Sequence, residues 1–228
     1  MKQLIFLIFI CTIAKNASGQ RIGNDYFWGI KAGAVFPTNL GRANDEVGFK
    51  DVASTGTTAG ATVGWQYNER LSLAVAFNYQ YLPKRSSFWN VESKGNFSAN
   101  YQASSMLIEG NYYFNNAQCR PYCGVNFGMH YLRNLIDFDS RYSGSDNDAS
   151  IRYVATQWKP GLGFCVGLLM PFTKNTDLVF ESRLCIIPYL KEEMVPIMDG
   201  DLILDYFTKN PHGNQNQIGF TIGINFKM

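Results

Sequence analysis

Four charged residues are the first candidates for chemistry, because each is expected on a face that otherwise carries small or polar side chains. They are two cations and two anions: Lys31, Glu109, Glu181 and Arg183. In a confined interior these charges should pair, because an unpaired buried charge is costly. Such a cluster would either plug a narrow space or form a gated pore in which the ion pairs exchange partners. We expect the plug, because a small barrel is filled by its own side chains.

His130 is the second candidate, because an imidazole can act as an acid or a base near neutral pH. We expect it to point inward near the outer rim of the fold, with Asp137, Asp139, Ser140 and Ser143 following it. Their spacing matches no nucleophile motif. A histidine that only donates and accepts hydrogen bonds is therefore the favoured interpretation, and an enzyme working at the rim is the alternative.

The cysteines give no indication of a metal or cofactor. Beyond the first residues the chain has Cys119, Cys123, Cys165 and Cys185, with no Cys-x-x-Cys and no Cys/His spacing typical of metal sites. Cys165 and Cys185 are expected on the same face of consecutive segments. The register that we estimate for this hairpin misses this pairing by several residues, so we expect the two thiols to be free or at best loosely coupled.

The elements that must position these residues are strands, because apolar and small or polar residues alternate along most of the chain. The clearest case runs from Leu71 to Tyr81, where every second residue is large and apolar. Eight segments share this pattern, namely residues 28–36, 59–67, 71–81, 106–114, 122–131, 161–168, 178–186 and 218–228.

The connections between these segments alternate strictly in length. Long ones cover residues 37–54, 82–100, 132–152 and 188–216, and short ones cover 68–70, 115–120 and 171–176. Short periplasmic turns and long extracellular loops are typical of outer-membrane barrels. One face of the strands is large and apolar while the other is small and polar, which would leave a soluble barrel with a poor core. The sequence therefore predicts an all-β fold: an eight-stranded antiparallel up-and-down transmembrane β-barrel.

The start of the chain is typical of a secretory leader. A short positive start is followed by an apolar run over residues 4–13 and by small residues at 17–19. We expect cleavage after residue 19, which leaves a barrel domain over 20–228. Cys11 suggests a lipoprotein as the alternative, but the bulky Ile10 before it does not fit that processing signal. The formal net charge of +2 includes Lys2 and Lys15 of this leader, so the mature chain lacks the basic surface of a nucleic-acid binder.

Three segments carry a family resemblance. They are the leader that ends in Ala-x-Gly before Gln20, the glycine-rich Gly29-Ile30-Lys31-Ala32-Gly33, and the final strand over residues 218–228. With them the chain resembles the PorT-like outer-membrane β-barrel family of Bacteroidetes, and more broadly the eight-stranded barrels similar to OmpA and OmpW. The resemblance implies location and architecture, and it carries over no catalytic residue. The final strand resembles the signal read by the barrel-assembly machinery, with Met228 where an aromatic residue is usual.

The function expected from these features is that of a non-enzymatic outer-membrane barrel. Its expected partners are the lipid bilayer with its lipopolysaccharide and the barrel-assembly machinery, and no nucleic acid is expected. The long loop over residues 190–217 is unusually apolar for a segment in water, so it either binds an envelope or surface protein or packs on the other loops. The alternatives are a small pore or hydrophobic-ligand carrier, and, less favoured, the rim enzyme.

Overall fold

The computed structural model describes residues 25–40, 49–85, 96–114, 119–139, 150–188, 194–199, 202–208 and 215–228. The predicted leader lies outside them. The strands are β1 (Asp25–Pro37), β2 (Gly56–Gln66), β3 (Leu71–Pro83), β4 (Asn96–Tyr113), β5 (Arg120–Asp139), β6 (Ser150–Thr173), β7 (Thr176–Ile186), β8 (Met194–Asp199), β9 (Leu202–Thr208) and β10 (Gln217–Lys227), and the one short helix is α2 (Phe49–Val52). No helix within the described ranges is long and apolar enough to cross a membrane.

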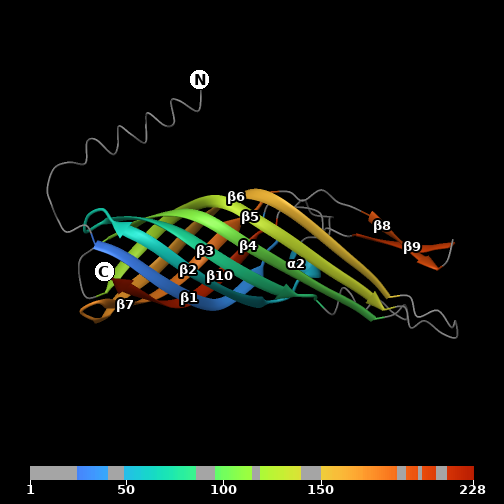
Figure 1. Cartoon of the computed structure of the whole chain (residues 1–228), viewed down its shortest axis with the longest axis horizontal. Coiled ribbons are helices and arrows are strands. Elements are labelled where there is room, and N and C mark those ends of the chain that lie inside the picture. The colour runs from blue at the N-terminus through green and yellow to red at the C-terminus, as the bar shows by residue number, and fades with distance from the viewer. Residues whose placement is uncertain are drawn as a thin grey trace, which may run out of the picture.

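Eight of the strands form a closed antiparallel barrel (Figure 1). Consecutive strands pair with each other, and β10 closes the barrel by pairing with both β7 and β1. Eleven residue pairs join β1 to β10, from Phe27–Lys227 to Pro37–Gln217. On the outside of this seam Trp28 stacks on Phe226, with ring centroids 4.4 Å apart. The predicted closed, up-and-down, eight-stranded barrel is confirmed.

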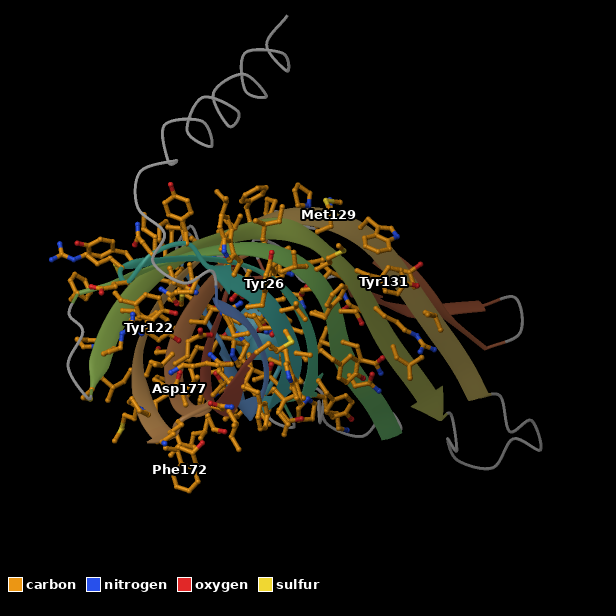
Figure 2. All side chains as sticks on the ribbon, turned by 60° about the vertical axis from the view of Figure 1, so that its left-hand side comes forward. Tyr26, Tyr122, Met129, Tyr131, Phe172 and Asp177 are labelled. Carbon is orange, nitrogen blue, oxygen red and sulfur yellow. The ribbon has the colours of Figure 1, made fainter. Side chains whose placement is uncertain are left out.

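The alternation in the sequence sorts the side chains between the two sides of the wall. On β3 the apolar Leu73 and Phe77 are exposed to the outside by 53% and 54%, whereas Ala74 and Ala76 are buried inside. Figure 2 shows Met129 and Phe172 projecting from the outer surface in the same way. Because successive residues of a strand point to opposite faces, this one pattern fixes which residues line the lumen.

Three strands run further than the sequence predicted. Pairing between β4 and β5 continues to Asn96–Asp139, and pairing between β5 and β6 continues to Asp139–Ser150. Residues 96–100, 132–139 and 150–152 of the predicted connections are therefore strand. The pattern ended too early because Ser104, Arg133 and Thr156 put exposed polar side chains on the outer face, although the backbone pairing goes on.

The first long connection contains a feature that the sequence did not predict. The helix α2 and the residues around it place Phe49, Val52 and Ala53 in a buried apolar cluster with residues of β1, β3 and β4. We call this cluster the apolar cap; it consists of Val35, Phe49, Val52, Ala53, Leu82, Ala99 and Tyr101. Backbone hydrogen bonds from Ser54 N to Pro83 O and from Arg85 N to Val52 O, each 2.8 Å, hold it at the end of β3.

The last long connection also contains structure of its own. Strands β8 and β9 pair with each other as a separate two-stranded sheet, from Met194–Thr208 to Asp199–Leu202. Figure 1 shows this hairpin beyond the barrel, at the end away from the C terminus. The loop predicted over 190–217 therefore includes a β-hairpin.

Some inward glycines make room for the side chain of the neighbouring strand. A Cβ built on Gly167 of β6 would lie 2.4 Å from the ring of Tyr122 on β5, so that ring occupies the space above the glycine. By contrast, Gly110 of β4 lies on the outer face with Ile108 and Tyr112, and a Cβ there would meet nothing within 4 Å. Both glycines lie within strands, but a Cβ would clash at Gly167 and would have free space at Gly110.

Replacing each of these glycines by alanine should therefore have opposite effects. We expect Gly167→Ala to lower the free energy of unfolding by about 1 to 3 kcal/mol, because Tyr122 must leave its position. We expect Gly110→Ala to be neutral or to stabilise by up to about 1 kcal/mol, because alanine restricts the unfolded chain. Urea unfolding of the folded barrel, followed by tryptophan fluorescence, measures both. Equal losses in the two variants would contradict this packing.

Candidate functional site

The four charged side chains predicted inside the barrel meet as one cluster, to which we refer as the ion cluster. Lys31 Nζ lies 3.2 Å from Glu181 Oε1 and 3.8 Å from Glu109 Oε1. Arg183 bonds Glu181 Oε1 through NH2 and Nε, at 2.8 and 3.0 Å, and it also pairs with Glu109. Exposed fractions of 3 to 10% for these side chains show that all four are withdrawn from bulk water. Two positive and two negative charges leave the cluster neutral.

The register of the barrel explains how residues so far apart in sequence meet. Arg183 and Glu181 lie on β7, and across β10 they stand beside Gly219 and Thr221. On the other side of β10, Lys31 of β1 stands beside Gly223. A Cβ on Gly223 would lie 2.8 Å from the Lys31 Cβ, so the glycine leaves room for the lysine. Gly223 of β10 thus allows Lys31 of β1 to reach the charged side chains of β7.

Tyr122 completes the cluster, and sequence reasoning did not single it out. Its hydroxyl donates to Glu181 Oε2 at 3.0 Å, which satisfies the carboxylate oxygen that faces away from the cations. The ring packs at 5.5 Å from that of Tyr113, within an apolar group that also contains Cys165, Leu169 and Val179. The strand alternation places Tyr122 inside, but no sequence signal identifies its partner.

Two small cavities flank the ion cluster. Measured as the space that the centre of a water molecule can occupy, they are about 20 and 30 Å³, and Lys31 and Glu181 line both. A water molecule requires about 10 to 15 Å³ by this measure. Each of these two cavities therefore has room for one or two water molecules.

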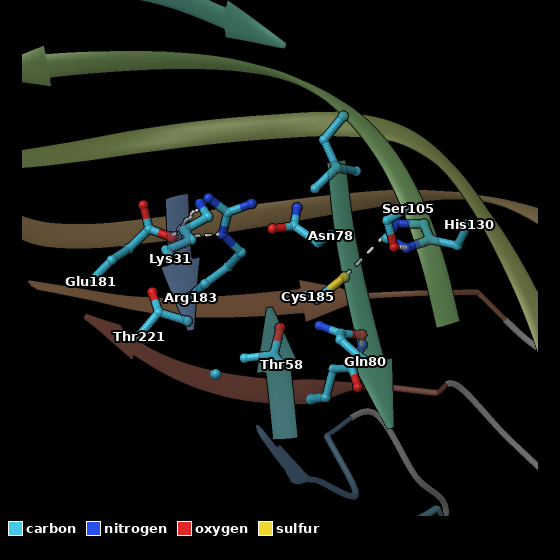
Figure 3. A pocket seen from close by; sticks show the side chains of 13 residues that line it. Lys31, Thr58, Asn78, Gln80, Ser105, His130, Glu181, Arg183, Cys185 and Thr221 are labelled. Atoms are coloured by element: carbon cyan, nitrogen blue, oxygen red, sulfur yellow. Dashed lines mark hydrogen bonds and ion pairs between the residues drawn. The ribbon is translucent and has the colours of Figure 1, made fainter. Parts of the chain in front are cut away.

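His130 lies deeper than predicted. Its side chain is 1% exposed, and it stands at the middle of β5, opposite Ser105 of β4 and Lys159 of β6. The sequence placed it near the rim because the extensions of β4, β5 and β6 were not recognised. Nδ1 of the ring lies 2.6 Å from Ser105 Oγ, and Nε2 lies 3.8 Å from Cys185 Sγ. Figure 3 shows these contacts in the cavity lining, to one side of the ion cluster.

The cysteines are free, as expected. Cys119, Cys123, Cys165 and Cys185 form no disulfide. Cys165 stands opposite Arg183, and Cys185 stands opposite Gly163. The two inward thiols therefore miss each other by two residues along the strands. The estimate that the hairpin register keeps them from facing each other is confirmed.

Removing Lys31 should weaken the barrel much more than removing an exposed lysine. Lys31→Gln leaves two buried carboxylates with Arg183 as their remaining cation, and we expect a loss of about 2 to 4 kcal/mol in the free energy of unfolding. The matched control is Lys174→Gln in the exposed turn between β6 and β7, where we expect a change below about 0.5 kcal/mol. Urea titrations of both variants in the same detergent check this. A loss for Lys31→Gln no larger than that of the control would show that the cluster does not stabilise the fold.

Comparison with known proteins supports the architecture. The sequence matches no protein-family model and no curated protein. Among solved structures, a major outer membrane protein from Thermus thermophilus is 12% identical with a TM-score of 0.51, covering 89% of this chain and 99% of that chain. The outer membrane protein OprG from Pseudomonas aeruginosa is 13% identical with a TM-score of 0.50, covering 90% of this chain and 96% of that chain. The chain thus has the fold of eight-stranded outer-membrane β-barrels.

Proposed function

We propose that this chain is an integral outer-membrane barrel with a closed lumen, which acts as a structural and partner-binding protein. The observation that carries the proposal is the inverted distribution of side chains. Val63, Leu162 and Ile222, from three different strands, are 57 to 61% exposed on the outside, while four charged side chains lie inside. In water this arrangement would leave a large apolar surface uncovered. In lipid it is the expected one, because hydrocarbon covers the apolar face.

The contents of the lumen support closure over conduction. The apolar cap occupies one end, the ion cluster lies further in, and Tyr113 and Tyr122 pack beyond it toward the short turns. The two cavities of about 20 and 30 Å³ beside the cluster are large enough for water molecules but too small for a larger solute. We therefore favour the plug over the small pore or ligand carrier.

The position of His130 supports a non-enzymatic role. A side chain that is 1% exposed cannot contact a peptide or lipid substrate at the barrel rim. Its hydrogen-bond partner Ser105 is equally enclosed, at 7% exposed. The rim enzyme considered from the sequence requires both groups at the surface, so these contacts favour a structural role for the pair.

The location and the partners of the protein are proposed from its leader, its final strand and its long connections. The leader over 1–19 would export the protein, and the final strand β10 would present the signal for the barrel-assembly machinery. Lipid and lipopolysaccharide would surround the outer face. The apolar β8–β9 hairpin would then project from the cell surface, where it offers a docking segment for an envelope or surface protein.

We further propose that the chain belongs to the PorT-like family of Bacteroidetes, which is more specific than the fold. This membership is supported by the glycine-rich stretch Gly29-Ile30-Lys31-Ala32-Gly33, whose glycines lie inside β1, and by the patterned final strand. In β1 a Cβ on Gly29 would lie 2.8 Å from the backbone oxygen of Ile224, so a larger residue there would press on β10.

Conductance measurements on the folded protein test the proposal. The purified barrel should run with a different mobility on a denaturing gel before and after boiling, which establishes folding, and it should then give no open-channel current in a planar bilayer. Both expectations follow from a paired barrel filled by its own side chains. Steady unitary currents from heat-modifiable protein would support the pore instead. A protein that is soluble without detergent would overturn the membrane assignment itself.

A further inference from the structure

A second polar group lies in the lumen, apart from the ion pairs that close it. It consists of Ser105, His130 and Cys185, which are between 1 and 7% exposed. His130 Nδ1 contacts Ser105 Oγ at 2.6 Å, and Nε2 faces Cys185 Sγ at 3.8 Å (Figure 3). A histidine that donates one ring N–H to a fixed acceptor presents the lone pair of its other nitrogen in a fixed direction. With the proton on Nδ1, that lone pair points at the thiol.

The wall is shaped to accommodate this imidazole. Gly161 of β6 lies next to the ring, and a Cβ there would come within 2.4 Å of His130 Nε2. The cavity of about 20 Å³ is bounded by His130 and Cys185 together with Gln217. The ring nitrogen of His130, the sulfur of Cys185 and the cavity therefore lie next to one another.

Gln217 gives an independent indication of a ligand at this place. It is 1% exposed, and it lines the same small cavity as Cys185 and His130. The amide nitrogen donates to Gln80 Oε1, whereas Gln217 Oε1 is buried and has no partner among the residues that the structure describes. A buried amide oxygen without a donor is costly, and a bound cation would satisfy it.

The distance between the two strong donors suits a bridging metal ion. With the bond lengths of zinc as the reference for a first-row metal ion, about 2.3 Å to thiolate sulfur and 2.0 to 2.1 Å to imidazole nitrogen, the two donor atoms lie about 3.6 to 3.8 Å apart for angles between tetrahedral and trigonal. The observed separation of Sγ and Nε2 is 3.8 Å. An ion can thus take the position of the thiol proton without movement of the strands.

We propose that His130 and Cys185 bind one soft monovalent cation of the Cu(I) type, with Gln217 Oε1 as a weak third donor. Thiolate and imidazole are the ligands that such ions prefer. On binding, the thiol proton leaves and a metal–sulfur bond forms, with no change of oxidation state.

Charge decides between monovalent and divalent ions. The ion cluster is already neutral, so a monovalent ion with one thiolate adds no net charge to the lumen. A divalent ion would leave an uncompensated positive charge on the same strand as the Arg183 guanidinium, in a site withdrawn from water. Structural zinc usually takes four protein ligands. Within the described ranges no group of three or more His, Cys, Asp or Glu side chains is placed to hold a metal.

Anaerobic titration with Cu(I) tests the site. The full-length mature barrel carries Cys119→Ser and Cys123→Ser, which removes the two thiols that are not buried. It is folded in detergent with Cu(I) present, so that the closed lumen does not limit entry, and is then titrated against a chromophoric Cu(I) chelator. We expect one Cu(I) per barrel, with a thiolate-to-Cu(I) charge-transfer band in the ultraviolet. Cys185→Ser should abolish the band, and His130→Gln should weaken binding at least tenfold.

The matched control is Cys165→Ser, because Cys165 is also buried in the lumen but faces Asn111 Oδ1 at 3.5 Å instead of a histidine. This variant should keep full stoichiometry and affinity. Heat-modifiability on a gel confirms that every variant is folded. Absence of Cu(I) from the folded background protein, or equal binding by the Cys185→Ser variant, would overturn the proposal. Neither result would affect the assignment of a closed membrane barrel.

Discussion

Closure of the sheet is the constraint on which the rest of the structure depends. A backbone N–H or C=O without a partner is costly in hydrocarbon, so a sheet can stand there only if it has no edge. β10 meets this requirement by pairing with β7 on one side and β1 on the other. Once the ring is closed, each strand has one face in the lumen and one face outside. In the bilayer that we propose, exposed apolar side chains such as Val63 would then be the stable arrangement, because lipid covers them.

Closure also determines what the interior must contain. A narrow lumen cannot solvate charges freely, so ionised side chains within it have to neutralise each other. Three strands supply side chains that neutralise each other, namely Lys31, Glu109, Glu181 and Arg183. Tyr122 donates a hydrogen bond to one remaining carboxylate oxygen. The apolar cap around Phe49 closes the lumen with a different kind of contact, apolar packing. The ion cluster and the apolar cap are thus two chemically distinct layers of the lumen, with water-sized cavities beside the ionic one.

Strand alternation was sufficient to predict the ring of eight strands and the inward direction of the four charged residues. Once a strand is recognised, its period of two determines which face each residue occupies. It could not give register, which depends on which backbone groups pair across strands. His130 was therefore placed at the rim, although it lies mid-strand, and the extensions of β4, β5 and β6 past Ser104 and Thr156 were missed. The part of the apolar cap that comes from α2 belongs to no strand, so no period-two pattern indicates it. Phe49 and Val52 are buried by tertiary contacts with Leu82 and Tyr101, which local sequence does not encode.

The most direct test of this account is whether the outer face of the wall contacts lipid. The folded protein carries Cys119→Ser and Cys123→Ser and is reconstituted in bilayers. A spin label is attached either to Phe77→Cys on β3 or to Lys174→Cys in the turn after β6. Phe77 is 54% exposed on the outer surface, so its label should be relaxed by oxygen, which concentrates in lipid, and protected from a water-soluble nickel chelate. The label at 174 should show the opposite order. Equal access of the nickel chelate to both positions would contradict the membrane-spanning barrel.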